Sequence, residues 1–179
     1  RHVHYEEAFR VVPYALELLA RDGGDVWREA VDASDVDDYI RSQLDEDDTR
    51  EMAFNFIREA RRPAFVPDLL QQALDASQPT DARLRSIQVA AAMANRANTP
   101  IDTLEALITD EQGRIANEAL TILGRFRDNA SRKSLHAFVL DDTRPRGLRR
   151  TAARLLVETK PGAMALLKSA EDGALSTDI

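Results

Sequence analysis

Four eight-residue segments, each starting 33 residues after the one before, decide the fold of this chain. They read REMAFNFI at residues 50–57, RLRSIQVA at 83–90, ANEALTIL at 116–123 and RRTAARLL at 149–156. Each carries a small residue at its fourth position and an apolar residue at its eighth, which lie one helical turn apart on the same face. A small residue at that place lets two helices approach closely. The spacing therefore predicts a helix hairpin that recurs every 33 residues and stacks on its neighbour.

A second helix is expected between successive segments, because a leucine recurs there at the same step. These residues are Leu74, Leu107 and Leu140. Apolar residues at helical spacing set the expected bounds of both helices. The first helices are predicted over residues 49–60, 82–97, 114–126 and 146–158, and the second helices over residues 66–76, 101–109, 132–140 and 162–170. Asp48, Asp81 and Thr143 are predicted to cap the first helices, since their side chains can accept amide hydrogen bonds at a helix start.

The chain before residue 48 does not follow the repeat. Residues 3–21 predict one helix and residues 35–44 a second, acidic one. Residues 1–47 are therefore predicted to be an irregular helical cap, because terminal repeats depart from the pattern where one face meets solvent. Residues 48–179 are the predicted repeat array. The next equivalent of Ala152 would fall at position 185, so the array is expected to be truncated at its C-terminus and to continue in a longer parent protein.

Composition places the chain among folded proteins and narrows its chemistry. Of its 179 residues 44% are hydrophobic and 31% charged, which is normal for a globular protein. The net charge of −7 disfavours general affinity for nucleic acid or for an anionic membrane. Cysteine is absent, which excludes thiol catalysis and is compatible with either a cytoplasmic or a periplasmic location. No apolar run approaches the length of a membrane span, so membrane insertion is not expected.

The repeated units resemble HEAT repeats, the paired-helix modules of α-solenoid scaffolds. The resemblance is strongest in residues 148–156, LRRTAARLL, followed by residues 161–167, PGAMALL. It implies an all-α fold, an α-solenoid of about four to five stacked hairpins that winds into a right-handed superhelix. In that family an Asp and an Arg recur between units as a ladder. Arg50, Arg83 and Arg149 match the basic position, and Ala116 interrupts it.

The resemblance also implies a function and a face for it. HEAT arrays generally bind proteins or act as spacers, and the second helices line the concave face that commonly carries the ligand. The expected partner is another protein, or flanking domains of the same chain. The corresponding second-helix positions are Gln71, Gln72, Thr103, Glu105, Lys133 and His136. The chain is thus predicted to be a non-catalytic interaction or spacer module of bacterial type, part of a larger multidomain protein.

A basic stripe supports a different function. Arg146, Arg150 and Arg154 lie four residues apart on one helix and could meet nucleic-acid phosphates, as in a HEAT-like repair protein. The favoured interpretation is that this arginine cluster, which also includes Arg144 and Arg149, forms ion pairs along the stack. The candidate carboxylates are Asp141, Asp142, Glu118 and Glu158.

No catalytic residue, cofactor or metal site is predicted. The only histidines are His2, His4 and His136, which do not form the convergent set of ligands that zinc needs. Residues 32–38 follow the start of a calcium loop, but the glycine at its sixth position is missing and Gln43 stands where the glutamate is needed. Solvated acids at a helix start are the favoured interpretation.

The last part of the chain allows a third hypothesis. Residues 166–175, LLKSAEDGAL, resemble the helical regions between a sugar-dehydrogenase-like propeller and a c-type cytochrome in large secreted bacterial proteins. That resemblance implies a helical linker between a catalytic and a cytochrome-like domain. The chain itself contains no Cys-x-x-Cys-His haem motif.

Overall fold

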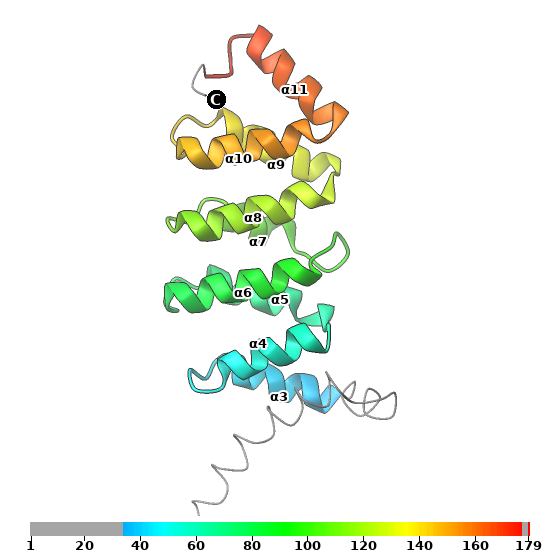
Figure 1. Ribbon diagram of the computed structural model, residues 1–179, viewed down its shortest axis with the longest axis vertical. Coiled ribbons are helices and arrows are strands. Elements are labelled where there is room, and N and C mark those ends of the chain that lie inside the picture. The colour runs from blue at the N-terminus through cyan, green and yellow to red at the C-terminus, as the bar shows by residue number, and fades with distance from the viewer. Residues whose placement is uncertain (1–33, 177–178) are drawn as a thin grey trace, which may run out of the picture. The chain divides into compact units, whose positions relative to one another are not determined.

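The computed structural model describes residues 34–176 and 179, and every regular element in that part of the chain is helical (Figure 1). The all-α prediction is therefore confirmed for these residues. The chain divides into two compact units, residues 1–68 and residues 69–179. The helix predicted over residues 3–21, together with His2 and His4, lies outside the described residues. The boundary predicted between residues 47 and 48 stays a prediction.

The first unit contains α3 (Ser34–Leu44), α4 (Arg50–Glu59), a short 3-10 helix (Pro63–Phe65) and the first residues of α5 (Val66–Leu74). α3 packs against α4, and the core between the elements is apolar. Its fully buried members include Ile40, Phe56, Ile57 and Phe65. The buried Arg50 closes the end of α3, because its Nε donates to the carbonyl of Leu44 at 2.7 Å. The last carbonyls of a helix have no partner within the helix, so a guanidinium there stabilises the end.

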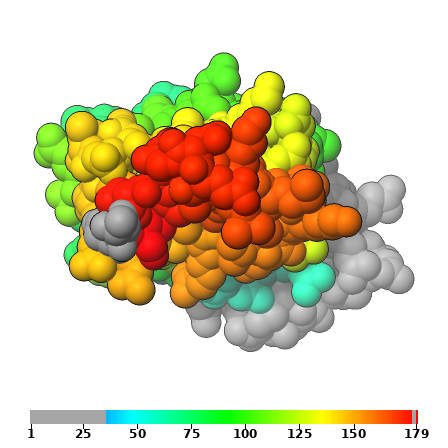
Figure 2. Space-filling view, turned by 90° about the horizontal axis from the view of Figure 1, so that it is seen from above, coloured from blue at the N-terminus to red at the C-terminus, as the bar shows by residue number. Residues whose placement is uncertain are grey.

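The second unit contains the rest of α5 and six further helices. These are α6 (Thr80–Met93), α7 (Ile101–Leu107), α8 (Gly113–Phe126), α9 (Asn129–Leu140), α10 (Arg146–Val157) and α11 (Lys160–Glu171). α8 packs against both α6 and α10, so these three first helices lie side by side in one layer. α7 and α9 lie behind that layer, where α7 packs on α8, and α9 packs on α8 and α10 (Figure 1). α11 packs on α9 and α10 and forms the surface at the C-terminal end (Figure 2).

The small residue of each repeated segment is buried, as predicted. Ala53, Ser86, Ala119 and Ala152 all have a relative exposure of zero. A glycine allows a further close approach, because a Cβ atom added to Gly124 of α8 would lie 2.8 Å from Cδ2 of Leu155 in α10. The close contact of first helices thus depends on small side chains, which is the physical content of the repeat.

The buried arginines at the 33-residue step make a recurring contact. Arg83 Nε donates to the carbonyl of Ala73 at 2.8 Å, and Arg149 Nε donates to the carbonyl of Val139 at 2.9 Å. Each acceptor lies ten residues earlier, near the end of the preceding second helix. Where Ala116 replaces the arginine, the equivalent carbonyl of Ala106 accepts a hydrogen bond from Thr109 Oγ1 at 2.8 Å. These side chains therefore close the ends of second helices.

Each of these two arginines also pairs with a carboxylate, but the partners differ. Arg83 pairs with Asp110, in the loop after α7. Arg149 pairs with Asp142, in the loop before its own helix, at 2.5 Å. The Arg83 pair therefore joins successive hairpins, whereas the Arg149 pair is local.

The predicted N-caps are wrong. α4 begins after Thr49, α6 after Pro79 and α10 after Pro145, and none of these residues makes a side-chain cap. Before α6 and α10 the proline itself supplies the extended backbone that starts the helix, with ψ of 139° and 129°. Asp81 lies inside the first turn of α6, and Thr143 donates instead to Asp141. A proline two residues from the expected cap thus moved the start of each helix.

Side-chain caps are present at two second helices. Asp128 accepts from the backbone N–H of Ser131 at 2.8 Å at the start of α9, and this hydrogen bond lowers the pKa of Asp128 below its usual value. Thr159 accepts from the N–H of Gly162 at 3.2 Å at the start of α11. α9 and α11 consequently begin earlier than the apolar pattern predicted, at Asn129 and Lys160.

Candidate functional site

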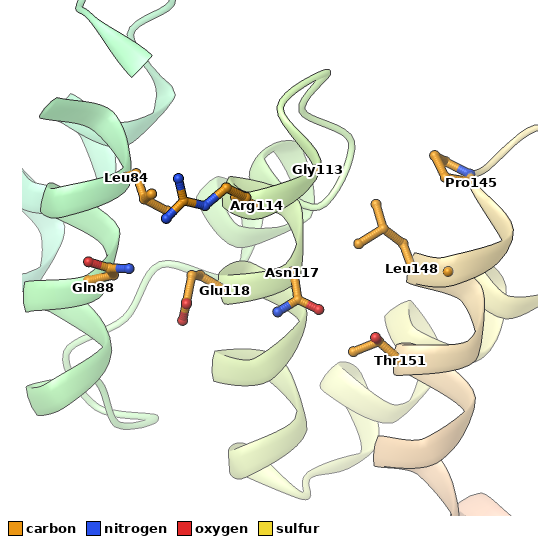
Figure 3. A pocket seen from close by; sticks show the side chains of 10 residues that line it. Leu84, Gln88, Gly113, Arg114, Asn117, Glu118, Pro145, Leu148 and Thr151 are labelled. Carbon is orange, nitrogen blue, oxygen red and sulfur yellow. The ribbon is translucent and has the colours of Figure 1, made fainter. Parts of the chain in front are cut away.

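A groove of about 450 Å³ crosses the exposed side of α6, α8 and α10 (Figure 3). It is lined by Leu84, Gln88, Gly113, Arg114, Asn117, Glu118, Pro145, Gly147, Leu148 and Thr151. The 33-residue register explains how these residues meet, because equivalent positions of adjacent first helices lie beside one another. Two glycines near the starts of α8 and α10 help to form the space. A Cβ atom at Gly113 or Gly147 would meet no other atom within 4 Å.

The half of the groove between α6 and α8 is polar. In Figure 3 the Arg114 side chain extends from α8 toward Leu84 on α6, and Gln88 and Glu118 lie between the same two helices. Arg114 and Glu118 make no hydrogen bond or ion pair with any other residue that the structure describes. A buried network does not occupy them, so both charges are open to a ligand.

The half between α8 and α10 mixes an amide with apolar groups. Asn117 points from α8 toward α10, where Leu148 and Thr151 face it (Figure 3). The Leu148 side chain is half-buried and adds apolar surface. Pro145, which precedes α10, closes this end of the groove.

Two arginines of the predicted basic stripe lie on the same face as the groove. Arg150 and Arg154 are one register step from Asn117 and Thr121 of α8. Both arginines are exposed and, among the residues that the structure describes, neither has an ion pair or a hydrogen bond. Arg146, at the start of α10, is also exposed.

The favoured interpretation of this arginine cluster holds in part. Arg144 pairs with Asp141 at 2.8 Å, and Arg149 pairs with Asp142. The interpretation is wrong for Arg150 and Arg154. The carboxylates expected for them are taken or too far away, since Glu158 lies 3.8 Å from Arg127 and Glu118 is unpaired in the described part of the chain.

The six predicted partner-binding residues do not form one free surface. Gln71 and Lys133 are exposed, Thr103 is half-buried, and the other three are bound to neighbouring helices. Ser86 Oγ donates to Gln72 at 2.6 Å, Ser134 Oγ donates to Glu105, and His136 Nε2 lies 2.8 Å from Ser169 Oγ. These three side chains therefore link helices, whatever else they do.

The sequence contained a signal for the groove that the prediction did not use. Gly113 and Gly147 stand at the starts of two first helices, although glycine is a poor helix former. Placed beside an exposed arginine, glycines at such positions indicate space above a helix start. The spacing alone did not show which neighbouring side chains would frame that space.

Other kinds of site find no support in the residues that the structure describes. No group of three or more histidine, aspartate or glutamate side chains there could hold a metal ion. Within the same residues, no helix combines the length and the apolar character needed to cross a membrane. Comparisons with family models, with curated proteins and with solved structures find no match to this chain.

Proposed function

We propose that this chain is a non-catalytic protein-interaction or spacer module, an α-solenoid of HEAT-like hairpins. The observation that supports it most is the recurring contact of Arg83 and Arg149, each with a carbonyl ten residues earlier. The same contact at the same step means that each unit joins its neighbour in the same way. In such arrays stability is the sum of repeat and interface terms, and the helix faces form one extended surface.

An extended, ordered surface suits binding. Little conformational entropy is lost when a partner binds to helices that are already in place. The groove across α6, α8 and α10 has this character, since it takes residues from three helices of the second unit. Its single carboxylate, Glu118, lacks the second acid or the nucleophile and base that hydrolytic chemistry needs. Binding is therefore the function that the groove supports best.

The repeat architecture can be tested by deleting one whole unit. Removal of residues 84–116 joins Arg83 to Asn117 and keeps the register of the remaining helices. We expect this shorter chain to stay helical and to unfold cooperatively at a lower temperature, because only nearest-neighbour contacts are lost. Removal of residues 84–99 deletes a helix without its partner and is expected to unfold the second unit. Circular dichroism during heating measures both, and equal behaviour of the two deletions would contradict the proposal.

Binding can be tested by selecting peptides from a random displayed library on the immobilised chain. The proposal expects enriched sequences that also bind the chain in solution, and a library that yields none would overturn it. The predicted second-helix face is tested in the same assay by the double substitution Gln71→Arg and Lys133→Glu. Both side chains are exposed, and neither makes a contact with another described residue. A loss of affinity at an unchanged melting temperature places the partner on the second helices, and unchanged affinity places it elsewhere.

A further inference from the structure

We infer that the groove across α6, α8 and α10 binds an acidic peptide segment that also carries apolar side chains. This inference rests on the proposed function and specifies the ligand and the face. It assigns binding to the first helices, whereas the second helices were predicted to carry it.

The charges around the groove favour an acidic ligand. Arg114 lines the groove, and Arg150 and Arg154 flank it on α10, all without ion pairs in the described residues. The guanidinium group presents a planar set of donors that matches a carboxylate, and such pairs are strong. Glu118 is the only acid among the lining residues. In a chain of net charge −7, a group of unpaired arginines on one face is a local exception that a negatively charged partner would neutralise.

The uncharged lining favours a peptide over a nucleic acid. Gln88 and Asn117 have side-chain amides with no partner in the part of the chain that the structure describes. A side-chain amide both donates and accepts, so it can pair with the C=O and the N–H of a peptide backbone. A phosphate offers acceptors only, and the Glu118 carboxylate would repel it. Leu148 adds an apolar contact for a peptide side chain.

The size and form of the groove agree with this ligand. A volume of about 450 Å³ lies within the range of roughly 300 to 1,000 Å³ that is common for binding sites. The groove is open rather than enclosed and crosses three parallel layers of side chains, so an extended segment can enter and leave at its ends. The register places one unpaired arginine at each side of that path, on α8 and on α10.

The test uses the full chain and three fluorescent probes. The first probe is a peptide of alternating aspartate and leucine, the second replaces aspartate by lysine, and the third is a short DNA duplex. We expect the acidic peptide to bind and the basic peptide not to bind. The double substitution Arg114→Glu and Arg150→Glu should weaken acidic-peptide binding by about tenfold per arginine, since each loses a charge-assisted hydrogen bond. Fluorescence anisotropy measures the affinities at a fixed salt concentration.

A second variant blocks the groove without changing charge. Gly147→Phe places a large side chain where a Cβ atom meets nothing within 4 Å, and it replaces a poor helix former in α10. We expect it to abolish peptide binding at a melting temperature no lower than that of the parent chain. Lys133→Glu is the matched control, because it makes the same charge change on an exposed position of α9 outside the groove. This control should bind the acidic peptide within about twofold of the parent chain.

The outcomes separate this inference from the proposed function. Equal binding of the acidic and basic peptides, or unchanged affinity in the Arg114→Glu and Arg150→Glu variant, would overturn the inference. Duplex binding that the same variant removes, without binding of the acidic peptide, would overturn it in favour of the nucleic-acid alternative. If the displayed library yields peptides that are not acidic and that bind Gly147→Phe normally, the proposed function stands and the assigned groove is wrong.

Discussion

Replacing Arg83 by methionine is expected to lower the free energy of unfolding by about 3 to 5 kcal/mol. Arg83 and its partner Asp110 are both buried, with side chains 7% and 11% exposed. Methionine keeps the apolar stem but removes the charge, so Asp110 is left without its cation in a dry environment. The carbonyl of Ala73, which accepts from Arg83 Nε, also loses its donor. Urea denaturation followed by circular dichroism measures the loss.

The matched control is the same substitution one register position on. Arg149→Met removes an equivalent contact to the carbonyl of Val139, but the partner Asp142 is 74% exposed and can be solvated. We expect a loss of about 1 to 2 kcal/mol. Adding Asp110→Asn to Arg83→Met should recover part of the larger loss, because it removes the uncompensated charge. Equal losses for Arg83→Met and Arg149→Met would show that the carbonyl contact, and not the buried carboxylate, sets the cost.

Gly162→Ala is expected to destabilise the end of the second unit by about 3 kcal/mol, at the upper end of the usual cost of overpacking. The new Cβ atom would lie 2.2 Å from the carbonyl oxygen of Leu156, a backbone atom that cannot rotate away. It would also lie 2.9 Å from Thr159 Oγ1, which caps α11 by accepting from the Gly162 N–H. The turn between α10 and α11 must therefore move, and the cap is weakened. Thermal denaturation of the variant and the parent chain measures the effect.

Two other glycines provide the controls for this prediction. Gly124→Ala should cost about 1 kcal/mol, because its Cβ atom meets the end of the flexible Leu155 side chain. Gly147→Ala should be neutral or stabilise by up to about 1 kcal/mol, since nothing lies within 4 Å and alanine is the better helix former. The expected order of cost is Gly162, Gly124, Gly147. Any other order would mean that the helix ends relax more freely than these contacts allow.

The residues that hold the helices together differ from those that line the groove. Arg83 and Arg149 are buried and bonded, whereas Arg114 and Glu118 make no contact of this kind in the described part of the chain. Substitutions in the groove should consequently change binding without unfolding the chain. Substitutions at the buried arginines should unfold it without revealing anything about a ligand.

The C-terminal end of the second unit shows how the register controls exposure. Val157, Met164 and Leu167 are large apolar residues that are more than half exposed. The position equivalent to Val157 in the preceding unit is Gly124, which is buried under Leu155 of the next first helix. Among the described residues, no further hairpin follows α11 to cover these side chains (Figure 2).

The sequence by itself determined the local structure and the buried positions of this protein. Periodic apolar residues predicted the helices from α3 to α11, and the 33-residue step identified the small residues Ala53, Ser86, Ala119 and Ala152, all of which are buried. Both signals are local, because the spacing of side chains on one helix decides which of them can face a neighbour. The recurrence of Arg83 and Arg149 at one register position was readable for the same reason.

Only the tertiary structure decided which groups meet across helices. The cation that pairs with Asp110, the helix starts set by Pro79 and Pro145, and the absence of partners for Arg150 depend on loop paths that no spacing encodes. The groove is likewise a property of three helices at once. Its lining residues come from α6, α8 and α10, which are distant in sequence, and they meet because close packing of small residues brings the helices side by side.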